Sequence, residues 1–561
     1  MSPRPNSAEF TSTEIGMRSP GEREPGISRS TLRIRWTGFL LGLIFSTLIY
    51  AIMPAGVEHA AKLTAAVAVL MAVWWMTEAL PIAATSLVPL VAFPVLGTDV
   101  EMETVGASYG NPIIFLFLGG FLIALAMQRW NLHRRIALVT LSIMGDRPGP
   151  MIAGFMIATG FISMWVSNTA TAVMMLPIGM SVLMIVSKVI GTAINDGAGH
   201  DAASRDAASR DDAGRDAAGR DAAGRDGVDG AAGDPSDSGD DTGIGAVVKS
   251  NFGTALMLGI AYSASIGSLG TIIGTPPNLF LVGYLKDNHD ISIGFGQWMI
   301  VGVPLAVVMM AIAWFLLVKV LFKPEIDRIP GGRELIREEL AKLGPMSTGE
   351  KLVLAMFVLA AVSWISLPLI FEEPPISDEG IAMAVGLLLF LIPGGANRGV
   401  RLLDWDTAEK LPWGVLLLFG GGLALSAQFS ESGLTEWIGT TTSGLGVLPR
   451  VLVVAIFAAI ILFLTELTSN TATAATFVPV VGGVAMGLDL DPLLLTIPVA
   501  LAATCAFMLP VATPPNAVAF GSGYVTVAQM VKGGLWLNVI GIVLVTATVY
   551  LLAVPVFGIT V

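Results

Sequence analysis

The sequence predicts an all-α polytopic membrane protein, with about 11 transmembrane helices and two re-entrant helical hairpins arranged as an inverted repeat. Three observations predict this fold class. Charged residues make up 13% of the chain and hydrophobic residues 54%, whereas a soluble protein carries about 25% charged residues. Apolar runs of about 20 residues recur from Trp36 to the C-terminus. The two halves of the chain also carry matching polar motifs.

The composition also excludes several classes of function. The single cysteine, Cys505, permits neither an intramolecular disulfide nor a cysteine-rich zinc site, and the four histidines are scattered along the chain. We see no cleavable signal peptide, because the first apolar run starts only near Trp36. The sequence shows no membrane-embedded nucleophile–base pair and no metal cluster. We therefore expect that the protein is not an enzyme, has no organic cofactor and binds no nucleic acid.

Hydropathy predicts the following membrane segments, and Gly, Pro and charged residues mark their boundaries. Helices one to four are expected at about 36–53, 63–80, 82–97 and 111–129, followed by a short pair at 137–165 and 169–188. Helices five to nine are expected at about 252–285 (broken near 274–278), 298–322, 351–371, 379–394 and 411–429. A second short pair follows at 446–464 and 471–488, and then helices ten (492–529, broken near 512–516) and eleven (534–558). We interpret the two short pairs as re-entrant hairpins.

These segments group into nine regions. The first half comprises a cytoplasmic N-terminal tail (1–35), helices one to four (36–135, with the repeat beginning near 63), the first hairpin (136–189), an insert (190–250) and helices five and six (251–322). The second half comprises a cytoplasmic linker (323–350), helices seven to nine (351–440), the second hairpin (441–490) and helices ten and eleven (491–561).

Most of the net charge of −12 lies in the insert. Residues 196–241 hold 13 Asp and 5 Arg, and 201–225 repeat the pentads DAASR, DAASR, DDAGR, DAAGR and DAAGR. A segment without large apolar side chains cannot bury enough surface to offset the entropy of ordering it. The sequence therefore predicts a disordered loop here.

Basic residues orient the chain. Arg and Lys concentrate in the N-terminal tail and in the loops after helices four, six and eight, whereas the opposite loops are acidic. Cytoplasmic loops carry an excess of Lys and Arg, so we expect a multi-pass protein of the cell (plasma or inner) membrane with a cytoplasmic N-terminus. If instead each limb of a hairpin crossed the membrane, the basic loops would still share one side, because each hairpin would add two crossings. The charge distribution therefore sets the orientation and does not distinguish re-entrant limbs from crossing ones.

The polar motifs are duplicated. WVSNTATA (165–172) matches LTSNTATA (467–474) at an offset of 302, and LFLGGFLIALAMQ (116–128) resembles LLLFGGGLALSAQ (416–428). GTPPN (274–278) matches ATPPN (512–516) at an offset of 238. Helix four runs inward and helix nine outward in the expected topology, which makes the repeat an inverted one.

A single Ser or Thr in a membrane helix is usually explained by interhelical contacts. Here Ser-Asn-Thr occurs twice, each time in an apolar stretch, and this duplication favours a binding function. Two adjacent prolines break a helix, and a broken helix at membrane depth must line a cavity or bind a ligand. Freed carbonyls suit a cation, and half-helix N-termini suit an anion. No basic residue lies near either motif, so Asn168, Asn470 and the Ser and Thr hydroxyls, Ser167 and Ser469 among them, would hold the anion.

Oxygen-bearing residues near the motifs form two matching sets that suit Na⁺. The first set is Ser163, Ser167, Asn168 and the Gly274 region, and the second is Thr465, Thr468, Asn470 and the Ala512 region. Ser163 and Thr465 each lie one helical turn before the motif serine. Glu466, an acid beside the second motif, suggests either proton coupling or a structural hydrogen bond, and we favour the hydrogen bond.

These motifs resemble those of the divalent anion:sodium symporter family, which includes bacterial dicarboxylate transporters and animal citrate and sulfate carriers. The resemblance rests on 164–177, 270–280, 465–475 and 512–523 and covers about 36–558 except the insert. It implies a homodimer in the lipid bilayer that works as an elevator. Helices one to four and seven to nine would form a scaffold domain, and the hairpins with helices five, six, ten and eleven a transport domain.

The resemblance also implies which residues contact the substrate. Asn168, Thr169, Asn470 and Thr471 would contact its carboxylates from the hairpin tips, and Thr275, Pro276, Thr513 and Pro514 would help from the helix breaks. The two Na⁺ sites would be Ser163, Ser167, Asn168 and Gly274, and Thr465, Thr468, Asn470 and Ala512.

We therefore expect sodium-coupled symport of a small divalent anion, with C4-dicarboxylates such as succinate, malate and fumarate as the first choice. A sodium-independent dicarboxylate exchanger, a sulfate or citrate symporter, and a cation/proton antiporter that uses Glu466 remain alternatives. The intact hydroxyls of Ser163 and Thr465 favour the symporter over the exchanger.

Overall fold

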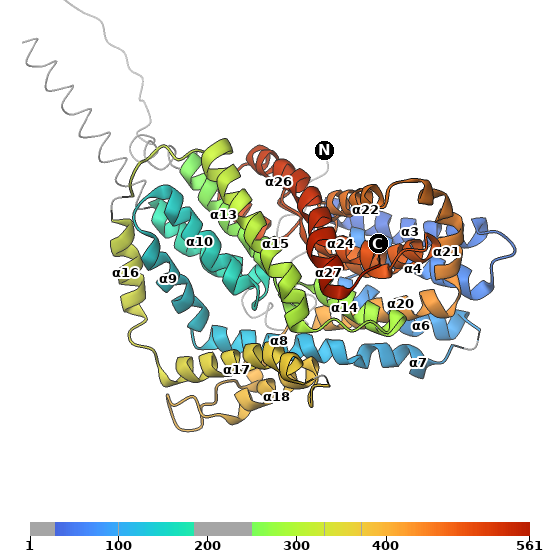
Figure 1. Ribbon diagram of the computed structural model, residues 1–561, viewed down its shortest axis with the longest axis horizontal. Coiled ribbons are helices and arrows are strands. Elements are labelled where there is room, and N and C mark those ends of the chain that lie inside the picture. The colour runs from blue at the N-terminus through green and yellow to red at the C-terminus, as the bar shows by residue number, and fades with distance from the viewer. Residues whose placement is uncertain (1–27, 99, 185–249, 330, 372, 561) are drawn as a thin grey trace, which may run out of the picture.

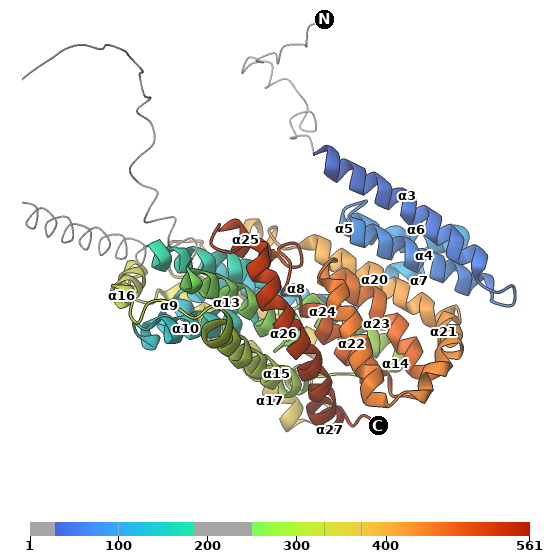
Figure 2. The same cartoon turned by 90° about the horizontal axis from the view of Figure 1, so that it is seen from above.

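The computed structural model describes residues 28–184 and 250–560, except 99, 330 and 372, and the regular secondary structure of these residues is all helical apart from one isolated β-bridge. The Asp-rich insert and most of the N-terminal tail lie outside the described residues. Figures 1 and 2 show an elongated molecule with α3, α4 and α6 at one end and α9, α10 and α16 at the other.

The first half contains the following elements: α3 (Arg29–Ile52), α4 (His59–Thr77), α5 (Ile82–Thr85), α6 (Val88–Leu96), α7 (Met102–Ala107), η1 (Ser108–Gly110), α8 (Pro112–Arg129), α9 (Leu132–Met144), α10 (Pro148–Ser163), the helix Asn168–Met184, α13 (Asn251–Ser268), η2 (Ile272–Gly274), α14 (Pro276–His289) and α15 (Phe295–Phe315), which continues as a π-helix, η3 (Leu316–Leu321).

The second half contains α16 (Gly332–Lys342), α17 (Thr348–Ile370), α18 (Asp378–Leu391), α19 (Trp405–Ala408), α20 (Trp413–Glu431), α21 (Leu434–Thr442), η4 (Ser443–Val447), α22 (Arg450–Thr465), α23 (Asn470–Gly487), α24 (Pro492–Thr504), α25 (Pro514–Gly521), α26 (Val527–Thr548), the π-helix η5 (Val549–Ala553) and α27 (Val554–Phe557).

The all-helical, multi-span prediction is confirmed. Seven helices of the described chain are long and apolar enough to cross a membrane. Several shorter apolar helices complete the fold, among them both limbs of the first short pair and the first limb of the second. α10 and α22 have 16 residues each, fewer than the about 20 that a crossing needs. Their lengths agree with re-entrant hairpins.

Several boundaries differ from the sequence prediction. The segment expected at 137–165 is two helices, α9 and α10, because the chain turns at Gly145 with a φ of 85°. The segment expected at 82–97 is divided into α5 and α6. α26 begins at Val527 rather than near 534, because Thr526 and Gln529 form a capping box at its start.

The repeat extends to backbone geometry. α10 and α22 occupy positions 302 residues apart, as do Asn131 and Gly433, which precede α9 and α21. Asn131 has a φ of 56° and Gly433 a φ of 74°. Asn and Gly are the residues that adopt this left-handed conformation most readily. Each half therefore makes the same turn after α8 or α20.

The two broken helices lie at the centre of the fold. Nearly every side chain of α13 and α24 is buried, as expected for helices that are apolar on all sides and enclosed by others. α10 packs closely on α13, because a Cβ on Gly267 would lie 2.2 Å from the carbonyl oxygen of Gly160. α14 and α25, the second halves of the broken helices, pack against the opposite repeat: α14 against α20 and α23, and α25 against α13.

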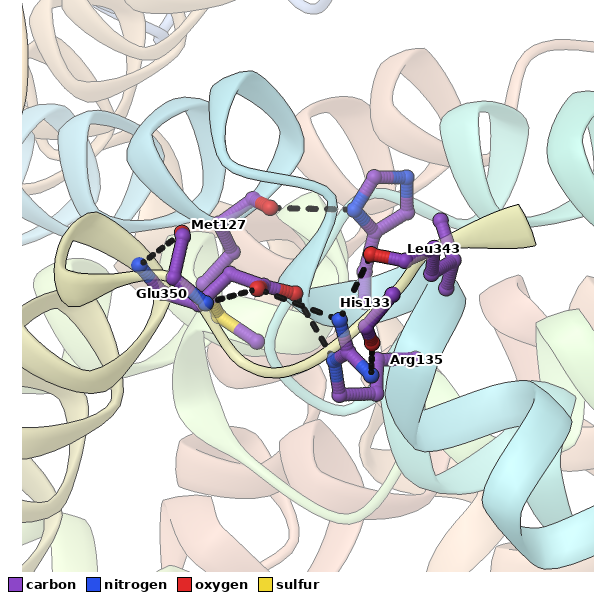
Figure 3. A network of polar contacts seen from close by, with 7 residues as sticks. Met127, His133, Arg135, Leu343 and Glu350 are labelled. Carbon is purple, nitrogen blue, oxygen red and sulfur yellow. Dashed lines mark hydrogen bonds and ion pairs between the residues drawn. The ribbon is translucent and has the colours of Figure 1, made fainter. Parts of the chain in front are cut away.

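A polar cluster fixes the start of α9 against the start of α17 (Figure 3). Arg135 donates to Glu350 at 2.8 and 3.2 Å and to the carbonyl oxygens of Leu343 and Gly344 at 3.3 and 2.9 Å. The two charged side chains are 13% and 6% exposed. Nearby, Nδ1 of His133 lies 3.0 Å from the Met127 carbonyl oxygen, and burial lowers the pKa of this imidazole.

Candidate functional site

A single cavity of about 910 Å³ brings the duplicated motifs together. It is lined by both hairpin tips and both helix breaks, although these segments are up to about 350 residues apart. The predicted site residues that line it are Ser167, Asn168, Thr169, Gly274, Thr275, Pro276, Thr468, Ser469, Asn470, Thr471, Ala512 and Pro514. Three others, Ser163, Thr465 and Thr513, do not line it and are fully or almost fully buried.

Four helices begin at this cavity. The helix Asn168–Met184 and α23 start at the two hairpin tips, and α14 and α25 start at the two breaks. Proline occupies the first position of α14 and α25, where its missing N–H removes no helical hydrogen bond. Helix N-termini carry unpaired N–H groups and a partial positive charge. The cavity can therefore hold an anion, although no Lys or Arg lies at the tips.

The first hairpin is bonded to α13 and its break. Ser163 donates its hydroxyl to the carbonyl oxygen of Ala264 at 2.6 Å. The Asn278 carboxamide donates to the Thr271 carbonyl oxygen at 3.0 Å, with longer contacts to those of Ser268 and Leu269. At the tip, the Asn168 Oδ1 accepts from the Thr169 amide at 2.8 Å. The main-chain oxygens of the break thus point toward one side-chain amide.

The second hairpin repeats this pattern with one difference. The Thr465 hydroxyl lies 2.9 Å from the Ala503 carbonyl oxygen, which matches the bond of Ser163, but also 2.8 Å from Oδ1 of Asn470. Asn516 donates to the carbonyl oxygens of Ala506 and Leu509 at 3.3 and 3.1 Å, as Asn278 does in the first half. The second tip is therefore tied directly to the residue behind it.

One buried carboxamide oxygen at each helix break lacks a donor. Oδ1 of Asn278 and Oδ1 of Asn516 have no hydrogen-bond partner, and both residues are fully buried. They occupy matching positions in the two breaks. An unpartnered buried carboxamide oxygen is costly, and a hard cation such as Na⁺ is a partner that satisfies oxygen without donating a proton. The donor chemistry of both breaks thus fits a cation.

Residues of other helices complete the lining of the cavity. Trp75 of α4, Phe117 and Phe121 of α8 and Val415 of α20 give it an apolar surface. The lining also includes four polar or charged residues, Arg35, Glu78, Gln128 and Lys410, of which Glu78 and Lys410 are exposed to solvent. Nothing in the sequence indicates this apolar lining, because ordinary apolar residues in a membrane helix carry no distinguishing pattern.

Thr275, which lines the cavity, and Thr504 join the two halves. Their hydroxyl oxygens lie 3.4 Å apart, and both residues are buried. Within residues 28–184 and 250–560, no group of three or more His, Cys, Asp or Glu side chains gathers as a transition-metal site would require. The arrangement provides binding groups for an anion and for hard cations.

Comparisons with known proteins identify relatives of the chain. The family model described as the sodium:sulfate symporter transmembrane region matches residues 33–558. A protein named sodium-dependent dicarboxylate transporter SdcS from Staphylococcus saprophyticus is 40% identical over 537 residues, which cover 93% of each chain. A protein of the same name from Staphylococcus aureus strain MRSA252 is 39% identical, again over 93% of each chain.

Two solved structures are similar at a lower level. The YdaH transporter of Alcanivorax borkumensis matches with a TM-score of 0.49 and 11% identity, over 95% of this chain and 99% of that one. MtrF of Neisseria gonorrhoeae matches with a TM-score of 0.48 and 13% identity, over 97% of this chain and 98% of that one. Both likenesses are too weak to add to what the helices themselves show.

Proposed function

The chain belongs to the sodium:sulfate symporter family, and on this premise we propose that it is a secondary active transporter that couples Na⁺ entry to the uptake of C4-dicarboxylates. The observation that carries this proposal is the convergence of both Ser-Asn-Thr tips and both helix breaks on one cavity. The names of the relatives at about 40% identity support sodium dependence and a dicarboxylate substrate.

The geometry of the tips suits a dicarboxylate such as succinate, malate or fumarate. Ser167, Asn168 and Thr169 would hold one carboxylate, and Ser469, Asn470 and Thr471 the other. Thr275, Pro276 and Pro514 would contact the substrate from the breaks, with Thr513 orienting the second break through its bond to the Asn516 amide at 3.3 Å. Two anion-binding tips in one cavity match a substrate with two anionic ends.

Two Na⁺ ions would bind behind the tips as co-transported substrate. The first would use Ser163, Ser167, Asn168 and the backbone at Gly274, and the second Thr465, Thr468, Asn470 and the backbone at Ala512. Support comes from the buried oxygens of Asn278 and Asn516 that lack donors in the two breaks. The positive ions would offset the charge of the dianion, since the tips carry no basic residue.

We further propose a homodimer of the cell membrane with a cytoplasmic N-terminus. The hairpins with α13–α15 and α24–α26 would move as a transport domain against a scaffold of α3–α8 and α17–α20. Arg35 and Lys410 line the cavity, and both residues belong to the basic segments that the positive-inside rule assigns to the cytoplasm. On this orientation the cavity faces inward.

Uptake of radiolabelled succinate into proteoliposomes tests the proposal, with an inward Na⁺ gradient compared with an equal K⁺ gradient. We expect uptake that needs Na⁺ and falls with excess malate. Uptake that is independent of Na⁺ and occurs only in vesicles preloaded with dicarboxylate would identify an exchanger instead. With folded protein and no succinate signal, labelled sulfate and citrate would be tested next, and a failure of all three would refute transport of a divalent anion.

A further inference from the structure

Glu466 has no counterpart in the first half of the repeat. It follows Thr465 directly and precedes the second Ser-Asn-Thr tip, and the residue 302 positions earlier is Met164. Glu466 is 3% exposed and does not line the substrate cavity. The other paired positions are Ser163 with Thr465, Ser167 with Ser469, Asn168 with Asn470, Gly274 with Ala512 and Val166 with Thr468, and none of them carries a charge. A charge on one side only makes the two sites chemically different.

The Glu466 carboxylate is held entirely by N–H groups. Oε1 accepts from the backbone amides of Phe507 and Met508 at 2.7 and 2.9 Å, and Oε2 accepts from those of Met508 and Leu509 at 3.1 Å each. The side-chain amide of Asn538, on α26, donates to Oε1 at 2.7 Å. Three successive backbone N–H groups around a carboxylate form an anion-binding concavity, or nest.

These contacts organise the second helix break. The backbone that gives its N–H groups to Glu466 gives its carbonyl oxygens, at Ala506 and Leu509, to Asn516. In the first half, the corresponding amides of Leu269 and Gly270 instead bond to nearby carbonyl oxygens of α13. Glu466 therefore joins three segments, which are the hairpin, the break and α26, and it sets the path of the loop that leads to Ala512.

The charge itself has no basic partner among the described residues. None of the ion pairs among the described residues includes Glu466, and no Lys or Arg donates a hydrogen bond to it. N–H donors satisfy the lone pairs of a buried carboxylate, but they do not supply a full positive charge. An ionised side chain inside a membrane domain calls for a partner. A cation bound between Thr465 and the Ala512 loop would supply one.

We propose that Glu466 is a positioning residue of the second Na⁺ site, which shapes its loop and supplies a fixed negative charge, so that this site binds Na⁺ more tightly than the first. The inference rests on the proposed sodium-coupled function. It adds that the two sites of the repeat are not equivalent and that the second fills first.

The test uses purified protein and ²²Na⁺ binding without dicarboxylate. In Glu466→Gln, which keeps the volume and removes the charge, we expect the half-saturating Na⁺ concentration of the tighter phase to rise about tenfold or more, because a unit charge nearby in a protein interior changes ion affinity by at least that factor. At saturating Na⁺, the succinate KM in proteoliposomes should change less than about twofold, since Glu466 does not contact the cavity. Met164→Leu, the matched variant of the first half, should leave both values unchanged.

A charge swap separates electrostatics from packing. Glu466→Gln combined with Asn538→Asp moves the carboxylate across one hydrogen bond, and we expect it to recover part of the lost Na⁺ affinity. If the double variant binds Na⁺ as weakly as the single one, the charge is not the cause. Unchanged Na⁺ affinity in a folded Glu466→Gln would overturn the whole assignment.

A second measurement tests the proposal if the Glu466→Gln variant does not fold. In the presence of Glu466, Thr465→Ala should abolish the tighter phase of ²²Na⁺ binding and Ser163→Ala the weaker one, and the reverse result would overturn the proposal. If the unaltered protein shows neither Na⁺ binding nor sodium-dependent uptake, the proposed function fails. If it shows both and the variants do not differ, only the role of Glu466 fails.

Discussion

Replacing Gly274 by alanine tests the first helix break at its tightest point. An added Cβ would lie 2.3 Å from the carbonyl oxygen of Ser268 and 3.0 Å from its carbonyl carbon. Both are backbone atoms, so no side-chain rotation can make room. A carbon needs more than 3 Å from an oxygen, and the loop between Ser268 and Gly274 would have to open by about 1 Å.

The size of the effect follows from what this loop holds. Its carbonyl oxygens accept from Asn278 at 3.0 to 3.5 Å, and its backbone at Gly274 belongs to the proposed first Na⁺ site. A shift of about 1 Å in a binding constellation costs on the order of 100-fold in rate. We therefore expect sodium-driven succinate uptake by Gly274→Ala to fall about 100-fold at limiting Na⁺.

The repeat provides the control. The equivalent position in the second half is Ala512, whose methyl group the structure already accommodates at 6% exposure. Ala512→Gly removes that group and should keep uptake within about threefold of the unaltered protein, because a glycine adds roughly 0.5–1 kcal/mol of chain entropy. Succinate uptake by both variants is measured in proteoliposomes with an inward Na⁺ gradient. Size-exclusion chromatography in detergent checks that each purified variant is folded. Normal uptake and normal Na⁺ dependence in a folded Gly274→Ala would show that the break holds no Na⁺.

Four further changes address other parts of the molecule. Asn470→Ala removes a tip carboxamide and should abolish succinate uptake while the protein still reaches the membrane, and full uptake would contradict the site. Thr465→Ala removes the hydroxyl between the hairpin and α24, so the Na⁺ concentration for half-maximal uptake should rise, which a Na⁺ titration measures. Arg135→Ala leaves a carboxylate buried and should cost about 3 kcal/mol, whereas Arg134→Ala, at a more exposed ion pair, should cost at most about 1 kcal/mol; equal melting temperatures in detergent would argue against the buried pair. Deletion of 202–230 should leave uptake intact, and loss of uptake in a folded deletion would assign the Asp-rich insert a role in transport.

The polar motifs made the candidate site largely predictable. Ser, Asn, Thr and paired prolines stand out in apolar runs, and their duplication at fixed offsets indicated which residues meet. The structure brings 12 of the 15 predicted site residues to one cavity. Their roles in binding stay a prediction.

Other features could not be read from the sequence, for physical reasons. α9 and α21 each begin after one residue with a positive φ, and a lone Asn or Gly signals no particular turn. The apolar wall of Trp75 and Phe117 resembles any other membrane helix in composition. All donors to Glu466 except the Asn538 side chain are backbone amides 41 to 43 residues away, and backbone amides leave no mark on a residue pattern.

The exchange of partners between the two repeats has a consequence for biosynthesis. α14 belongs to the first repeat but packs against α20, α23 and α24 of the second. At about 5–20 residues per second, translation of the roughly 200 residues from α14 to α24 takes on the order of 10–40 s. For that time the nascent first repeat carries an open helix break in the bilayer.

We expect a chain in this state to need the translocon or a chaperone to cover the break until its partners are synthesised. A ribosome that stalled after α15 would leave a fragment unable to complete its own core. The two repeats can be made as separate polypeptides by dividing the chain within the linker at 323–347. We expect them to assemble only when they are synthesised together.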